Sequence, residues 1–140
     1  MSKAELRRTW KEDGFECAIF EHLMAFMDYY TAYIGVPEEH VAVTVGASNY
    51  ERLPLNVHGG ITYSRNYLSD VDPDGEKEVF WIGWDYAHSF SDEMEIDEVI
   101  EEVRDVVDQL KHLSIDDCVR RFLEYKPDWV RENVRIDTDE

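Results

Sequence analysis

The stretch from residue 92 to residue 113 constrains the fold of this chain most, because its apolar residues recur at the spacing of an α-helix. Apolar side chains three and four positions apart fall on one face of a helix, and charged residues fill the other face. A helix with one apolar face needs a second layer of structure to cover it. The predicted apolar face consists of Val99, Ile100, Val103, Val106, Val107 and Leu110.

The second layer is predicted to be a small, mostly antiparallel sheet of about four strands. Its clearest strand is apolar on both faces, which is typical of a central strand. The stretch 15–36 favours two strands by its alternation and its β-branched and aromatic residues, although one continuous helix stays an alternative. We therefore predict an α+β fold in which the long helix and C-terminal helices pack on the sheet. The predicted strands are about 15–22, 29–36, 55–64 and 78–88.

Shorter signals predict the remaining elements. Residues 2–11 are interpreted as a short charged helix, which Gly14 separates from the next element. The run 72–75, Asp-Pro-Asp-Gly, predicts a turn, since Pro presets φ and Gly accepts a positive φ. Ser114 is the expected N-cap of a second helix. Pro127 is expected to end that helix.

The charge of the chain is strongly acidic, with 32 Asp and Glu against 14 Lys and Arg, a net charge of −18 and a pI near 4.5. General binding to nucleic acid needs clustered basic residues, so it is excluded, and binding to anionic membranes is disfavoured for the same reason. Two explanations stay open: a solvated surface of halophilic type, which the even spread of charge favours, and an acidic face that mimics nucleic acid.

Compartment and redox state are predicted from what the chain lacks. No signal peptide or membrane-spanning stretch is recognised, so we expect a soluble, cytoplasmic protein. Cys17 and Cys118 fit no metal or redox spacing and lie in apolar runs. They are expected to be buried, reduced thiols.

The segment 55–64 is the best candidate for a functional site. Its residues alternate between an apolar and a polar face, which predicts a strand. Gly59 and Gly60 interrupt this alternation where a ligand or another backbone would come close. A hairpin with a short Gly-containing tip is the alternative for the same residues.

Pairing this segment with 78–88 through the 72–75 turn predicts a polar constellation. His58, Asp85, His88 and Asp92 are expected to gather around a gap left by Gly59, Gly60 and Gly83. Imidazole and carboxylate groups are ligands for a divalent metal such as Zn or Mn, and without metal they provide a general base. The predicted catalytic residues are His58, Asp85 and His88, and the predicted ligand-binding residues are Gly59, Gly60, Thr62, Tyr63, Trp81 and Gly83.

Each of these residues also has an ordinary structural interpretation. His58 fits a hydrogen-bonded histidine beside a turn, and Asp85 fits a strand-end carboxylate. His88 and Asp92 fit solvated residues before a helix. His40 is a further candidate, reached through a long loop.

Two motifs give the chain a resemblance to a known family. Residues 57–64, Val-His-Gly-Gly-Ile-Thr-Tyr-Ser, and 81–88, Trp-Ile-Gly-Trp-Asp-Tyr-Ala-His, resemble segments of a family of small uncharacterised phage and prophage proteins. The stretch 33–37 with His40 is also similar to that family. The resemblance covers about residues 14–113.

The resemblance implies a compact α+β core that begins with strands, and it implies that His58, Asp85 and His88 act together. No established activity comes with it. Tyr86 stands where the family often has Cys, so no thiol chemistry is expected there. We therefore predict one domain over residues 1–140, with a family-like core over 14–113 and a helical extension over 114–140.

Three hypotheses about function follow. The first is an accessory protein of phage, prophage or archaeal-virus type whose pocket binds a small polar ligand or a divalent metal, in host interaction or anti-defence. The second is a metal-assisted hydrolase of phosphoester or acyl substrates that uses the same residues. The third is an acidic, nucleic-acid-mimicking inhibitor of a host protein. The sequence fixes no oligomeric state.

Overall fold

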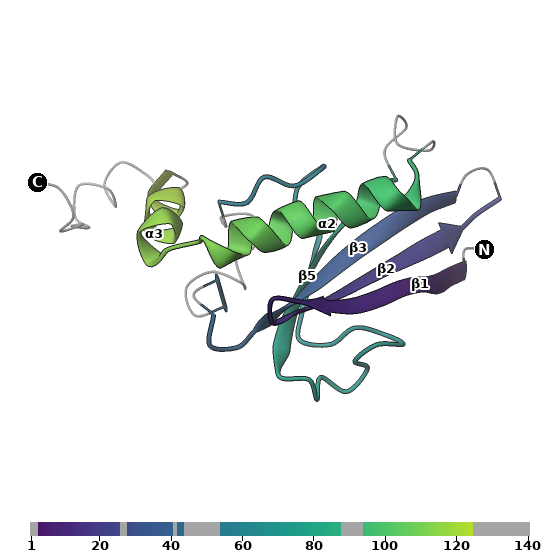
Figure 1. Cartoon of the computed structure of the whole chain (residues 1–140), viewed down its shortest axis with the longest axis horizontal. Coiled ribbons are helices and arrows are strands. Elements are labelled where there is room, and N and C mark those ends of the chain that lie inside the picture. Colours follow the sequence, from purple (N-terminus) through teal and green to yellow (C-terminus); the bar gives the residue numbers. More distant parts are fainter. Residues whose placement is uncertain (1–2, 26–27, 41, 44–53, 88–93, 125–140) are drawn as a thin grey trace, which may run out of the picture.

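A computed structural model describes residues 3–25, 28–40, 42–43, 54–87 and 94–124 of the chain (Figure 1). Within these residues it contains five strands and two helices of substantial length. The strands are β1 (Lys3–Glu12), β2 (Phe15–Leu23), β3 (Asp28–Pro37), β4 (Tyr63–Arg65) and β5 (Val79–Asp85), and the helices are α2 (Ile96–Lys111) and α3 (Ile115–Glu124).

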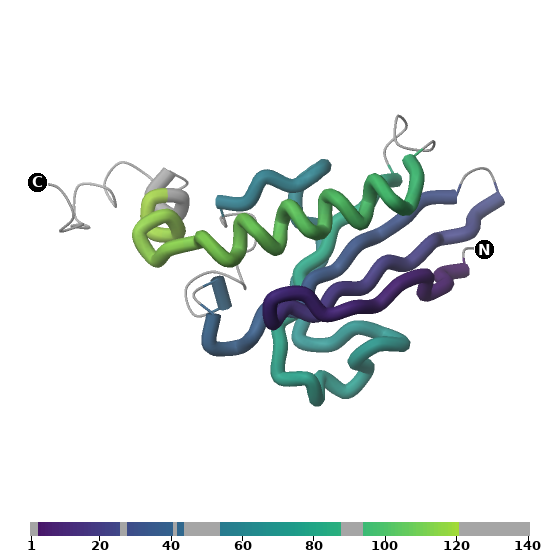
Figure 2. The backbone as a smooth tube through the Cα atoms, viewed as in Figure 1, coloured from purple at the N-terminus to yellow at the C-terminus, as the bar shows by residue number. Residues whose placement is uncertain are grey.

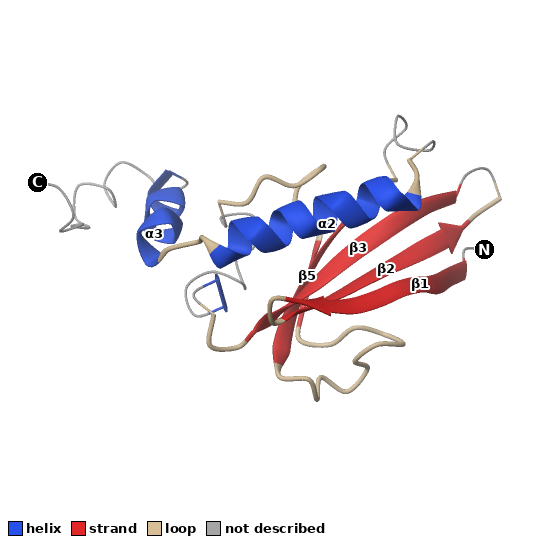
Figure 3. Cartoon of the chain, in the orientation of Figure 1, coloured by secondary structure: helices blue, strands red, loops and turns tan. Residues whose placement is uncertain are grey.

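The five strands form one antiparallel sheet in the order β1-β2-β3-β5-β4. α2 crosses one side of this sheet, and α3 follows beyond the C-terminal end of α2 (Figure 3). The loop from 66 to 78 joins β4 to β5 and lies on the side of the sheet opposite α2 (Figure 2). The predicted α+β architecture is confirmed, as are the strands expected near 15–22, 29–36 and 78–88.

The main core lies between α2 and the sheet. Alternate side chains of β2, β3 and β5 point toward α2, as the period of a strand requires. The predicted apolar stripe of the helix meets them, with Ile100 partly buried at its margin. Each large side chain that is fully buried there contributes on the order of 1.5–3 kcal/mol. The buried residues include Cys17, Ile19, Ala32, Ile34, Ile82, Trp84, Val99, Val103, Val106, Val107 and Leu110.

A smaller cluster lies on the opposite face of the sheet, which we call the open face because neither described helix covers it. The intervening residues of the same strands build it, and the 66–78 loop supplies further apolar side chains. Its buried members are Ala18, Phe20, Leu68, Val79 and Trp81.

The N-terminal segment corrects our prediction, because residues 3–12 form strand β1 and no helix. β1 pairs with β2 through a two-residue turn, Asp13-Gly14, in which both residues have positive φ (53° and 89°). Asp-Gly is the composition that such a hairpin turn favours. Most β1 side chains are exposed, so the strand lacks the alternation that would identify it.

The segment 55–64 also differs from the prediction. Only its last two residues join a strand, β4, while residues 54–62 form a loop. Gly59 and Gly60 have positive φ (70° and 81°), and the Gly60 amide bonds the Val57 carbonyl at 3.0 Å. This hydrogen bond closes a tight turn, but residues 54–62 form no strand, so neither the continuous strand nor the hairpin is present.

The helix boundaries follow local capping. α2 begins after Glu95, whose side chain forms a reciprocal capping box with Glu98. The predicted start at residue 92 lies outside the described residues. Ser114 caps α3 as predicted, since its Oγ accepts the Asp117 amide at 3.1 Å. Neither described helix is long and apolar enough to span a membrane.

Candidate functional site

His58 lies on the side of the sheet that α2 covers. Its ring stacks on the ring of Tyr86, with centroids 4.6 Å apart, and its backbone amide donates to Glu102 Oε2 at 2.8 Å. The Tyr86 hydroxyl donates to the other oxygen of Glu102 and accepts from Trp84 Nε1 at 3.0 Å. Burial, followed by the Glu102 hydrogen bond, raises the pKa of Tyr86 strongly. This network binds the 54–62 loop to the helix.

Further along the same loop, α2 replaces a strand as hydrogen-bonding partner. Gln109 accepts from the Asn56 amide at 2.7 Å and donates to the Asn56 carbonyl at 2.9 Å. Figure 2 shows the segment running beside α2. Helix side chains therefore satisfy backbone groups that a sheet would otherwise pair.

Asp85 lies on the open face. It stands opposite Thr31 of β3, and it has the same parity along β5 as Trp81, which is buried in the open-face cluster. Its Oδ2 accepts from Thr62 Oγ1 at 3.2 Å, and its Oδ1 accepts from the Ala87 amide at 3.1 Å. The side chains of His58 and Asp85 are thus separated by the sheet, and the cavity we predicted between them is not formed.

The predicted metal set is not assembled within the described residues. His88 and Asp92 lie outside them, and the described part of the chain holds no group of three or more His, Cys, Asp or Glu side chains arranged to bind a metal. His40 has a structural role instead. Its Nε2 donates to the Leu110 carbonyl near the end of α2 at 2.9 Å, and its Nδ1 accepts from the Ala42 amide at 3.0 Å.

A row of four polar side chains crosses the open face of the sheet. His22 of β2 meets Thr31 of β3, with 3.0 Å between Nε2 and Oγ1. Thr31 stands opposite Asp85 of β5, which bonds Thr62 just before β4. Four segments that are distant in the sequence therefore supply one continuous polar line.

A row of aromatic side chains lies beside the polar row. Tyr33 and Tyr63 flank Gly83 on the two neighbouring strands, and their rings meet edge to face with centroids 5.2 Å apart. Phe20 packs edge to face on Tyr33 at 5.6 Å. A Cβ at Gly83 would lie 2.4 Å from Tyr33 Cδ2, so only glycine leaves room for this ring.

A hollow of about 180 Å³ opens at this aromatic row. We call it the open-face hollow. β1, β2, β3, β4 and the start of the 66–78 loop all contribute to it, so the whole sheet arrangement is needed to form it. Its lining residues are Ala4, Phe20, His22, Tyr33, Tyr63, Leu68, Ser69 and Asp70.

Burial and nearby charge shift the pKa values of the titratable groups of the hollow. Burial lowers the pKa of His22, although the Asp85 carboxylate opposes this shift, so the imidazole is neutral at pH 7. Burial raises the pKa of Tyr33, and Thr31 opposes that shift by hydrogen bonding. Burial also raises the pKa of Tyr63. At neutral pH the hollow therefore offers neutral hydrogen-bonding groups beside carboxylates.

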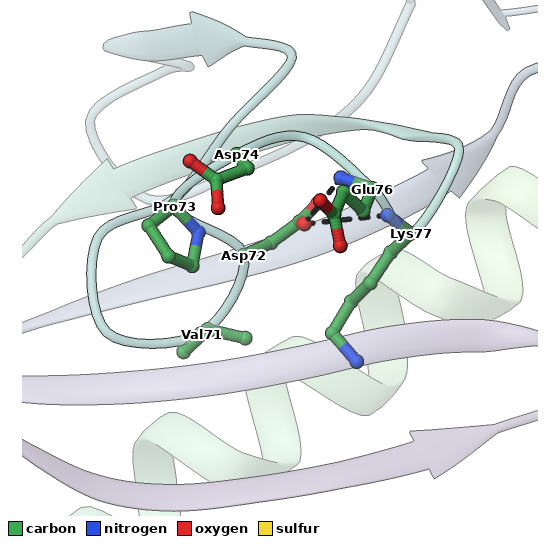
Figure 4. A pocket seen from close by; sticks show the side chains of 6 residues that line it. All are labelled: Val71, Asp72, Pro73, Asp74, Glu76 and Lys77. Carbon is green, nitrogen blue, oxygen red and sulfur yellow. Dashed lines mark hydrogen bonds between the residues drawn. The ribbon is translucent and has the colours of Figure 1, made fainter.

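A second hollow, of about 460 Å³, lies in the 66–78 loop (Figure 4). At its base the buried Asp72 turns inward, where Oδ1 accepts from the amides of Glu76 and Lys77 and Oδ2 accepts from Trp81 Nε1 at 3.0 Å. These donors engage the carboxylate, which therefore serves to fold the loop. Gly75 has φ +67°, as the predicted 72–75 turn requires.

The predicted ligand-binding residues divide between these places. Thr62, Tyr63 and Gly83 belong to the open face beside the hollow, and Trp81 is buried under the loop. Gly59 and Gly60 form the turn on the α2 side. His22 and Tyr33 were not predicted. The alternation of residues 15–22 and 29–36 was the signal that places both on the polar face of their strands.

Comparison of the chain with models of protein families, with curated proteins and with solved structures found no match. The resemblance to phage and prophage proteins therefore stays a prediction.

Proposed function

We propose that this protein binds a small polar ligand in the open-face hollow without chemical turnover. The observation that carries the proposal is that the aromatic row lies beside the polar row on the open face. Three aromatic rings there offer apolar contact next to His22, Thr31 and Asp85. Ligand sites typically combine an apolar wall with a few oriented polar groups. From the resemblance we further infer an accessory role in a phage or prophage.

The geometry gives the hydrolase alternative less support. That hypothesis needs His58 beside Asp85, whereas the sheet separates them, and Asp85 instead meets Thr31 and Thr62. A proton-transfer pair must lie within hydrogen-bond reach of one substrate. The inhibitor hypothesis concerns surface charge alone and stays a prediction.

The proposal is tested by a screen of small polar fragments, followed by amide chemical shifts in a ¹H–¹⁵N spectrum. Binding is expected to move the amides of residues in β2, β3 and β4 around the hollow. Ser69→Trp fills the hollow from an exposed loop position and is expected to weaken binding at least about tenfold. Gly83→Ala is expected to do the same, because its Cβ displaces the Tyr33 ring.

His58→Gln is the matched control, because it changes a histidine on the α2 side and leaves the hollow intact. It should bind fragments as the natural sequence does. Fragments that bind equally well to Ser69→Trp, or that move only amides on the α2 side, would contradict the proposal.

A further inference from the structure

We propose that the ligand of the open-face hollow is a small organic cation, an ammonium group carried on an apolar or aromatic body. This inference rests on the proposed function of the hollow and adds the chemical class of its ligand. Charge, ring geometry and size each support it.

The charge around the hollow is negative. Among its eight lining residues, all within the described part of the chain, Asp70 is the one Asp or Glu and none is Lys or Arg. Asp85 lies next to the hollow, near enough for its charge to act on both His22 and Tyr33. An anionic ligand would meet carboxylates here, and none of the lining residues is a cation that could pair with it.

Two basic residues of β1 that lie near Ala4 in the sequence are already paired. Lys3 lies 3.5 Å from Glu5, and Arg7 lies 2.8 Å from Glu5 and 2.9 Å from Glu21. Lys3 and Glu5 alternate with Ala4, the residue through which β1 reaches the hollow, so their side chains point to the opposite face of the sheet.

The aromatic rings suit a cation. An ammonium or guanidinium group is attracted to the face of an aromatic ring within about 6 Å of its centroid. The chain itself shows this contact, since the guanidinium carbon of Arg65 lies 5.9 Å from the centroid of the Tyr63 ring. Tyr33 and Phe20 extend the same electron-rich surface into the hollow.

The size of the hollow limits the ligand. Its volume of about 180 Å³ is below the roughly 300–1,000 Å³ that drug-sized ligands occupy. A ring with a short aminoalkyl arm is therefore a suitable probe.

Three probes of one shape separate charge from shape: 2-phenylethylamine is a cation, 2-phenylethanol is neutral and phenylacetate is an anion. Each is titrated into the full-length protein, and the amide shifts of the hollow give its Kd. The amine is expected to bind most tightly and phenylacetate least. Asp70→Asn is expected to weaken the amine about threefold and to leave the alcohol within error, since an exposed charge contributes only modestly to binding a cation.

Two further variants make the test specific for charge. Asp74→Asn removes the same charge from an exposed position that lines the second hollow, and it should leave all three affinities unchanged. Arg65→Gln removes the cation beside Tyr63, so it should strengthen the amine and weaken phenylacetate. A purely structural effect of a substitution would move all three probes together.

The outcomes distinguish this inference from the proposed function. If the alcohol or phenylacetate binds in the hollow as tightly as the amine, the cation inference is overturned and the hollow remains a ligand site. If other polar fragments bind in the hollow but the amine does not, the cation inference is again overturned and the hollow remains a ligand site. If no fragment binds in the hollow, the proposed function fails and this inference fails with it.

Discussion

At the scale of single residues, His22 shows how packing controls charge. Its ring stacks on the Tyr29 ring with centroids 4.8 Å apart, and Nε2 lies 3.0 Å from Thr31 Oγ1. Burial lowers its pKa from 6.5, and the Asp85 carboxylate only partly opposes this. As the pH falls below 6.5, the unfolded chain takes up a proton that folded His22 resists, so the folded state loses stability.

We therefore predict that His22→Gln reduces the pH dependence of stability. Between about pH 7.5 and 5.5, the melting temperature of the natural sequence should fall more than that of the variant. His112→Gln, which removes an exposed imidazole, is the control and should not flatten the curve in this way. Parallel curves for the natural sequence and His22→Gln would contradict the lowered pKa of His22.

Cys17 gives a second prediction at this scale. Its thiol is buried among the residues that face α2, and burial raises its pKa from 9.0 to about 12. Because the thiolate is the reactive form, its native reaction with a thiol reagent should be about 10³-fold slower than that of an unfolded cysteine. The measurement is the rate of colour release from Ellman's reagent in a Cys118→Ser background, with and without denaturant. Equal rates in both conditions would contradict this prediction.

At the scale of elements, one carboxylate organises the loop from 66 to 78. Asp72 accepts hydrogen bonds from two loop amides and from the Trp81 indole, and its backbone pairs with Leu68. Leu68 in turn lies against the open-face cluster and lines the open-face hollow. The fold of the loop and the shape of the hollow therefore both depend on the buried side chain of Asp72.

Asp72→Ala is expected to lower the free energy of unfolding by about 3 kcal/mol, because it leaves buried donors without an acceptor. Urea denaturation followed by tryptophan fluorescence measures this loss. Asp74→Ala, an exposed change in the same turn, should cost less than about 0.5 kcal/mol. If the two variants lose stability equally, Asp72 does not hold the loop in the way described.

The elements that the sequence predicts well are those that are buried along one face or along both faces. α2 and β5 have this character, so their periodicity predicts both their type and their buried face. β1 has little buried surface, and its best signal was the Asp13-Gly14 turn. The segment 55–64 has the apolar alternation of a strand. It forms a loop instead, because Gly59 and Gly60 adopt positive φ and side chains of α2 bond its backbone amides.

The candidate site was harder to predict for a related reason. Gly83 and Thr62 lie close to Asp85 in the structure, because Gly83 belongs to β5 and Thr62 lies at the start of the pairing between β5 and β4. The prediction placed His58 on the wrong face of the sheet, because it did not include the turn at Gly59 and Gly60. The position of His22 beside Thr31 and near Asp85 depends on the order of the strands in the sheet. Strand order is set by contacts between distant residues, which local periodicity does not report.

At the scale of the whole molecule, the net charge of −18 acts on every element. The two exposed cations of α2 pair with carboxylates at the β1–β2 turn, Arg104 with Glu12 at 3.2 Å and Lys111 with Asp13 at 3.0 Å. The exposed carboxylates of α2 outnumber these cations. Like charges on one compact surface repel, and dissolved salt screens that repulsion within about 10 Å at 0.1 M. The exposed acidic residues of α2 are Asp97, Glu98, Glu101, Asp105 and Asp108.

The acidic surface therefore predicts that salt stabilises the folded chain. Raising KCl from about 0.1 to 1 M should increase the melting temperature by roughly 5 °C, because screening removes self-repulsion that the expanded unfolded chain largely escapes. A neutral osmolyte at equal osmolality controls for effects that do not depend on charge. Replacing Glu101 with Gln and Asp108 with Asn should raise the melting temperature at low salt and shrink the response to KCl. If both variant and natural sequence respond identically to KCl and to the osmolyte, surface repulsion does not limit stability, and the excess of carboxylates requires a partner to explain it.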